Sequence, residues 1–181
     1  MFRQEQVTEI VELLETLDSS TKIYFGCDSV RVRKKGKWSA SYATVMIVHI
    51  NGKNGCRLFS NLSNEPDYDA KPARPKMRMM NEVRKVCELY TQMIPYIENF
   101  AEITEGPDGE LNVKEFGIEI HLDINTDPIH GSSCAAKEAA GYVLGMTGLT
   151  EDQVKLKPES FAASFGADAV ANGRVESSIG H

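Results

Sequence analysis

Two short glycine-containing turns constrain the fold of this chain most strongly, because they join three strand-forming segments in sequence. The turns are Lys34-Lys35-Gly36-Lys37 and Asn51-Gly52-Lys53-Asn54-Gly55, and glycine supplies the backbone geometry that hairpin turns need. The flanking segments are a buried apolar run at 23–27, a segment rich in β-branched and aromatic residues at about 38–50, and a third at about 56–60. The pattern predicts three neighbouring antiparallel strands.

Helical and strand patterns alternate in the rest of the chain. Before the first strand, apolar residues recur at helical spacing over residues 4–17. After a polar loop, the patterns predict a helix from about Pro75 to Ile97 that Pro95 kinks or interrupts, a turn at 106–109, and then strand 116–124, helix 132–146, strand 154–157 and helix 160–172. This order predicts an α/β fold with a mixed five-stranded sheet and helices on both faces.

The composition is ordinary for one globular domain, with 181 residues of which 41% are hydrophobic and 25% charged. We expect a single domain over residues 1–173, which includes the N-terminal helix, and a flexible tail over 174–181. No apolar run is long enough to span a membrane, and the first residues lack the layout of a signal peptide, so we expect a cytoplasmic protein. Four widely spaced cysteines without a Cys-x-x-Cys pair argue against a structural zinc site.

Two aspartates are placed where α/β sheets collect ligands. Asp28 follows the first apolar run, and Asp123 lies at the C-terminal end of the predicted strand 116–124. Two carboxylates about 4 Å apart repel by roughly 4 kcal/mol at an effective dielectric constant near 20, so a group of them takes up protons or binds a cation. Oxygen ligands of this kind select magnesium, manganese or calcium. The alternative is that Asp28 caps a turn and Asp123 faces solvent.

Five motifs follow one another along the chain in a specific order. They are Ile23-Tyr24-Phe25-Gly26-Cys27-Asp28-Ser29, Arg78-Met79-Met80-Asn81-Glu82-Val83, Gly117-Ile118-Glu119-Ile120-His121-Leu122-Asp123, Val154-Lys155-Leu156-Lys157-Pro158-Glu159-Ser160, and Ala162-Ala163-Ser164 ending in Ala167-Asp168. In this order they resemble the YkuK family of ribonuclease H-like proteins over roughly residues 5–172. The resemblance implies the ribonuclease H-like fold, which the predicted element order also fits.

The resemblance also implies an acidic site with one carboxylate from each of four elements. Asp28 would come from the first strand, Glu82 from the long helix, Asp123 from the fourth strand and Asp168 from the last helix. All four would be metal ligands and catalytic residues, with Asp28 bridging two Mg²⁺ or Mn²⁺ ions, Asp123 and Glu82 on one ion, and Asp168 on the other. For Glu82, the alternative is a solvated helix charge.

Basic residues form two clusters beside the predicted acidic site. The candidate nucleic-acid-binding residues are Arg31, Arg33, Lys34, Lys35, Lys37, Arg74 and Arg78. The hairpin that leaves Asp28 could hold the phosphates beside a scissile bond, and the alternative is a solvated turn. Trp38 and Tyr42 could stack on bases, but we predict that both belong to the core. We also predict that His121 is a packed, hydrogen-bonded histidine.

The sequence therefore predicts a divalent-metal-dependent nuclease that acts on RNA, DNA or a hybrid. The first alternative is a catalytically inactive nucleic-acid-binding module. It is motivated by the net charge of −6 and by Ala169, which stands where the family often has a basic residue after the last aspartate. A second alternative is a structural or protein-interaction domain. The sequence leaves the oligomeric state open, and a dimer is one possibility.

Overall fold

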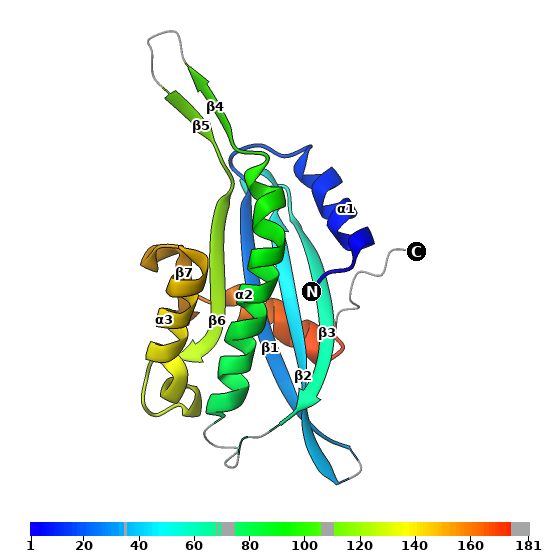
Figure 1. Ribbon diagram of the computed structural model, residues 1–181, viewed down its shortest axis with the longest axis vertical. Helices are drawn as coiled ribbons and strands as arrows, with labels where there is room; N and C mark the ends of the chain where they lie inside the picture. Colours follow the sequence, from blue (N-terminus) through cyan, green and yellow to red (C-terminus); the bar gives the residue numbers. More distant parts are fainter. Residues whose placement is uncertain (35, 68, 70–74, 106–110, 175–181) are drawn as a thin grey trace.

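The main sheet of this protein has five strands in the order β3-β2-β1-β6-β7. A computed structural model describes residues 1–34, 36–67, 69, 75–105 and 111–174 (Figure 1). The strands of the main sheet are β1 (Lys22–Lys34), β2 (Lys37–His49), β3 (Cys56–Pro66), β6 (Gly117–Asn125) and β7 (Val154–Lys157). β1, β2 and β3 are antiparallel neighbours, whereas β6 runs parallel to β1 and β7 parallel to β6. The predicted mixed α/β sheet is thus confirmed.

Helical segments cover both faces of the sheet, as predicted. Figure 1 shows α2 in front of the sheet and the orange C-terminal segment behind it. The helices are α1 (Gln4–Leu14), α2 (Lys76–Glu98), α3 (Ala136–Thr147) and α4 (Asp168–Ala171), and the shorter turns are η1 (Ile50–Gly52), η2 (Gly131–Ala135), η3 (Glu151–Gln153) and the π-helical η4 (Ala162–Ala167). Among the helices in the described part of the chain, none is both long and apolar enough to cross a membrane.

β1 is buried on both faces because its side chains alternate between two hydrophobic clusters. Phe25 and Cys27 pack in the large cluster that includes residues of α1, α2 and α3. Tyr24 packs in a smaller cluster on the other face, with Ala162 of η4 and Val170 of α4. A strand with two buried faces has a nearly continuous apolar sequence, which explains the apolar run that begins the first motif.

β1 is longer than predicted, so Asp28 lies within the strand and not at its end. Every residue of β1 is in register with β2, from the pair Lys22 and His49 to the pair Lys34 and Lys37. Backbone pairing along this hairpin keeps the polar second half of β1 extended. The prediction that the first strand ends at Asp28 is therefore wrong.

Other element boundaries also differ from the predictions. β3 continues to Pro66 because it pairs with β2 along its whole length, α1 ends three residues early, and α2 continues through Pro95. A separate two-stranded sheet, β4 (Glu102–Glu105) and β5 (Leu111–Lys114), occupies the predicted polar excursion. Its predicted turn at 106–109 lies outside the described residues, as do residues 175–181 of the predicted tail.

The two aromatic residues of β2 have different environments. Tyr42 is 2% exposed and belongs to the large cluster, as predicted. Trp38 is 45% exposed, so its assignment to the core is wrong. The reason is that Trp38 lies next to the turn of the β1–β2 hairpin, where none of the described helices covers the sheet (Figure 1).

Candidate functional site

Asp28 and Asp123 occupy equivalent positions in two neighbouring parallel strands. The registered pairs of β1 and β6 run from Lys22 and Gly117 to Cys27 and Leu122. Asp28 and Asp123 each follow the last of these pairs. Since residues at equivalent positions of in-register parallel strands point to the same face, the two carboxylates lie side by side where β6 stops pairing with β1.

The environment of Asp28 opposes its negative charge. Burial raises the pKa of Asp28 to about 6, and the negative charges of Asp123 and Asp168 add to the rise. The backbone N–H of Ser29 donates a hydrogen bond to Oδ1 of Asp28 at 2.7 Å, and this bond and the positive charge of Arg78 partly offset the rise. A carboxylate in this environment gains from a neighbouring cation.

Glu82 is a buried member of the same acidic group. It projects from α2 with 3% exposure, and its Oε1 accepts a hydrogen bond of 2.5 Å from the hydroxyl of Ser29. Burial, followed by the negative charge of Asp28, raises the pKa of Glu82 well above its ordinary value. The alternative that Glu82 is a solvated helix charge is therefore wrong.

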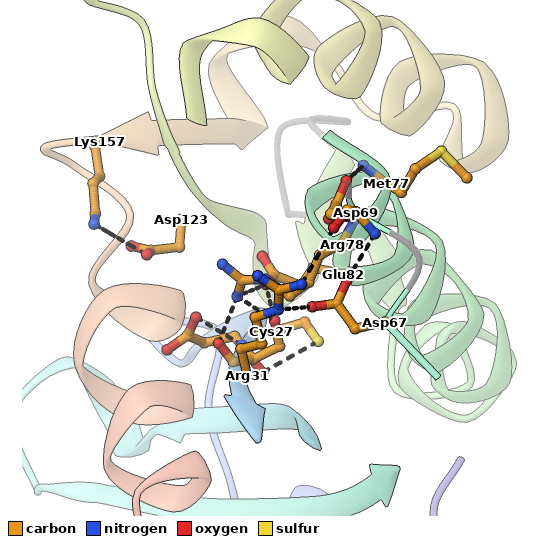
Figure 2. A network of polar contacts seen from close by, with 11 residues as sticks. Cys27, Arg31, Asp67, Asp69, Met77, Arg78, Glu82, Asp123 and Lys157 are labelled. Carbon is orange, nitrogen blue, oxygen red and sulfur yellow. Dashed lines mark hydrogen bonds and ion pairs between the residues drawn. The ribbon is translucent and has the colours of Figure 1, made fainter. Parts of the chain in front are cut away.

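Arg78 is the basic partner of Glu82, one helical turn earlier in α2. Its Nη1 lies 3.6 Å from Oε1 of Glu82 (Figure 2) and donates to the backbone oxygen and to the hydroxyl of Ser29, both at 2.7 Å. The carboxylate of Asp69 accepts the backbone N–H groups of Met77 and Arg78 and so caps the start of α2. Arg78, predicted as a nucleic-acid-binding residue, is thus built into the acidic site.

Asp123 is held by two side chains from the C-terminal part of the chain. The Nζ atom of Lys157 in β7 lies 2.8 Å from Oδ1 and 3.0 Å from Oδ2 of Asp123 (Figure 2). The hydroxyl of Ser164 in η4 donates to Oδ1 at 2.5 Å. Both carboxylate oxygens therefore have protein donors.

Asp168 begins α4, and 33% of its side chain is accessible to solvent. Its Oδ1 accepts a hydrogen bond of 2.7 Å from Nδ2 of Asn172, and its Oδ2 lies 3.1 Å from Nη1 of Arg174. Arg174, five residues after Ala169, is therefore the basic partner of Asp168.

The C-terminal segment that carries Ser164 and Asp168 is anchored on the sheet by His121. The buried His121 accepts the backbone N–H of Ala162 at Nδ1, at 3.1 Å, so its proton is on Nε2, which lies 3.0 Å from Glu119. Burial lowers the pKa of His121. The prediction of a packed, hydrogen-bonded histidine is confirmed.

The four carboxylates do not form a ready-made cation site. Within the described ranges, no three His, Cys, Asp or Glu side chains are close enough to hold one metal ion. Three of the carboxylates instead hold basic side chains, in the pairs Glu82 with Arg78, Asp123 with Lys157, and Asp168 with Arg174. The oxygen donors fit Mg²⁺ or Mn²⁺, and Asp28 has no ion pair in the described part of the chain.

The β1–β2 hairpin projects beyond the sheet (Figure 1). It carries the basic residues Arg31, Arg33 and Lys37. The guanidinium groups of Arg31 and Arg33 lie 4.3 Å and 5.6 Å from the ring centroid of Trp38. Arg31 also forms an ion pair with Asp67, whereas Arg33 and Lys37 are exposed.

Three of the candidate nucleic-acid-binding residues cannot be placed in this way. The side chain of Lys34 and the whole of Lys35 and Arg74 lie outside the described residues. Of the predicted nucleic-acid-binding residues, the structure therefore describes the side chains of Arg31, Arg33 and Lys37 in the hairpin and of Arg78 in the acidic site.

The comparison with known families agrees with this geometry. A family model described as ribonuclease H-like matches residues 5–172. The chain belongs to the ribonuclease H-like, YkuK-like family. The order of the five strands is that of a ribonuclease H-like fold, which confirms the resemblance drawn from the motifs. No curated protein and no solved structure gives a match.

Sequence patterns did not indicate several contacts of the candidate site. Lys157 and Ser164 both fall within the C-terminal motifs, so the motifs contained them without indicating that they contact Asp123. Ser29 follows Asp28 directly, and its hydroxyl donates a hydrogen bond to the carboxylate of Glu82. No sequence pattern pointed to Arg174.

Proposed function

We propose that this ribonuclease H-like protein is a divalent-metal-dependent nuclease that hydrolyses phosphodiester bonds of RNA, DNA or RNA–DNA hybrids. The observation that carries the proposal is the half-buried carboxylate of Asp28, whose pKa of about 6 reflects burial and the charges of Asp123 and Asp168. Groups with shifted pKa values of this kind cluster at functional sites, and proteins of the ribonuclease H-like family are often nucleases.

Asp28, Glu82, Asp123 and Asp168 would hold Mg²⁺ or Mn²⁺, which supplies an activated water and stabilises the leaving oxygen. The protein itself would orient these ligands. Ser29 donates to Glu82 and fixes its carboxylate, while Arg78 balances part of the negative charge from α2. No covalent nucleophile is needed, and the buried Ser29 is committed to its bonds with Glu82 and Arg78.

The projecting β1–β2 hairpin would contact the nucleic acid. Arg33 and Lys37 are exposed near its turn and can bind phosphates without regard to sequence. The partly exposed ring of Trp38 lies against the guanidinium groups of Arg31 and Arg33, and it can stack on a base. These contacts would hold a strand whose neighbouring phosphodiester bond reaches Asp28.

A second function is favoured by the state of Asp123. Lys157 and Ser164 already occupy both oxygens of this carboxylate, as expected for a nucleic-acid-binding module that has kept the fold and lost the chemistry. Such a module would bind with strong dependence on salt concentration and without dependence on metal.

The proposal is tested by cleavage of labelled single-stranded and double-stranded RNA and DNA and of a hybrid, with Mg²⁺ or Mn²⁺. We expect the parent to cut at least one substrate, and Asp28→Asn and Asp123→Asn to reduce the rate to background. Asp127→Asn is the matched control, because Asp127 is exposed in the turn after β6 and, among the described residues, its carboxylate accepts a hydrogen bond only from the backbone N–H of Ile129. If the two site variants cut as well as the parent, the proposal is wrong.

A further inference from the structure

The positively charged ammonium group of Lys157 lies beside Asp123, in the position that a bound metal ion would take. Its Nζ contacts both oxygens of the carboxylate, at 2.8 Å and 3.0 Å. β7, which carries Lys157, pairs with β6, which carries Asp123, and the pair Asn125 and Lys157 lies at the end of their register. The sheet therefore brings this lysine to the acidic group.

Lys157 is held less firmly than Arg78, the basic side chain that pairs with Glu82. Arg78 binds two oxygens of Ser29 in addition to Glu82, and its side chain is 18% exposed. The side chain of Lys157 is 37% exposed, and its ammonium contacts Asp123 alone among the described residues. A flexible lysine with one partly exposed partner can leave it easily.

We propose that Lys157 competes with a divalent cation for Asp123. The inference rests on the proposed function, in which Asp123 is a metal ligand, and it adds a residue of this chain that sets how strongly the site binds metal. In the free protein the ammonium satisfies Asp123, so a cation must displace it before this carboxylate can act as a ligand. Lys157 is thus a positioning residue that keeps metal affinity low.

The test is a titration of the full chain with Mn²⁺ in the absence of nucleic acid, with free Mn²⁺ measured by electron paramagnetic resonance. Lys157→Met removes the charge and keeps the apolar stem, so we expect it to bind Mn²⁺ about three- to tenfold more tightly than the parent. Lys157→Arg keeps a cation beside Asp123, so we expect no gain. Circular dichroism of each variant verifies folding, and Lys157→Gln replaces the Met variant if that variant is unfolded.

Lys155→Met is the matched control. Lys155 lies two residues earlier in the same strand, and its Nζ is 3.9 Å from Glu159, which is outside the acidic group. We expect Lys155→Met to bind Mn²⁺ nearly as the parent does. Equal gains in the two Met variants would mean a general effect of net charge and would overturn the proposal, as would no gain in Lys157→Met.

The outcome is independent of the nuclease test. A gain in Mn²⁺ affinity in Lys157→Met supports the competition even if no variant cuts nucleic acid. Conversely, if the parent cuts nucleic acid while Lys157→Met gains no Mn²⁺ affinity, the proposed function stands and the inference about Lys157 is wrong.

Discussion

Gly26 and Ala162 are in direct backbone contact. A Cβ atom at position 26 would lie 2.8 Å from the carbonyl carbon of Ala162 and 2.8 Å from the backbone nitrogen of Ala163. Only glycine leaves room for η4 to lie this close to β1. The contact lies two residues before Asp28 and brings Ser164 and Asp168 to the acidic group, which gives the glycine of the first motif a structural role.

The first prediction is that Gly26→Ala lowers the free energy of unfolding by about 1–3 kcal/mol, because the added methyl group meets backbone that has little freedom to move. Urea denaturation measures the effect. Gly145→Ala in α3 is the control, since a Cβ there has nothing within 4 Å, and alanine should stabilise the helix by up to about 1 kcal/mol. Equal stabilities of the two variants would contradict the close contact at Gly26.

The second prediction concerns the pH dependence of Asp28→Asn. Because the pKa of Asp28 rises from 3.8 to about 6 on folding, the folded state binds the proton more tightly, and its stability falls as pH rises between these values. At neutral pH the ionised side chain costs about 3 kcal/mol. The asparagine oxygen can still accept the N–H of Ser29, so Asp28→Asn should be more stable than the parent without metal.

The difference in unfolding free energy between Asp28→Asn and the parent should therefore depend on pH in a defined way. It should be largest above pH 6, shrink as the pH falls through about 6, and vanish below 3.8, where both proteins carry a neutral side chain. Thermal denaturation in buffers without divalent cations measures it. A difference that stays constant with pH would show that burial does not oppose the charge of Asp28.

The third prediction is that Arg78→Met destabilises the protein by about 1–3 kcal/mol, because the buried Glu82 and Ser29 lose a charged donor. Denaturant unfolding at neutral pH measures the loss. Arg84→Met is the control on the same helix, because Arg84 is 41% exposed and its ion pairs with Glu65 and Glu88 lie at the surface. Such pairs contribute about 0–1 kcal/mol, so comparable losses would argue against a structural role of Arg78 in the site.

The fourth prediction concerns the hairpin. Arg33→Glu and Lys37→Glu should weaken binding to duplex nucleic acid and reduce the slope of log K against log salt concentration by about 0.9 for each phosphate that the hairpin no longer neutralises. Lys53→Glu makes the same charge change in the exposed segment between β2 and β3, away from the hairpin turn. Fluorescence anisotropy at several salt concentrations separates the three variants, and an equal effect of Lys53→Glu would indicate non-specific attraction only.

Local patterns in the sequence were sufficient for much of the fold. The three antiparallel strands were predictable from two glycine-containing turns between apolar segments, and the later helices and strands from their periodicity. Asp28 was predictable as a candidate site residue because it follows a buried run, and Asp123 because it lies near the end of a strand. The motifs added Glu82 and Asp168, whose distance along the chain gives no local sign of a common site.

The tertiary structure decided which side chains meet and how long each strand is. β1 extends past Asp28 because β2 pairs with it throughout, and Lys157 reaches Asp123 because β7 pairs with β6. Periodicity reports whether a side chain is buried, whereas the partner of that side chain depends on the register and packing of segments far apart in the sequence. The sequence by itself therefore determined the elements of the main sheet and its helices and the candidate acidic residues. Only the packed structure showed that three of the carboxylates pair with basic side chains and that Asp28 has no ion pair among the described residues.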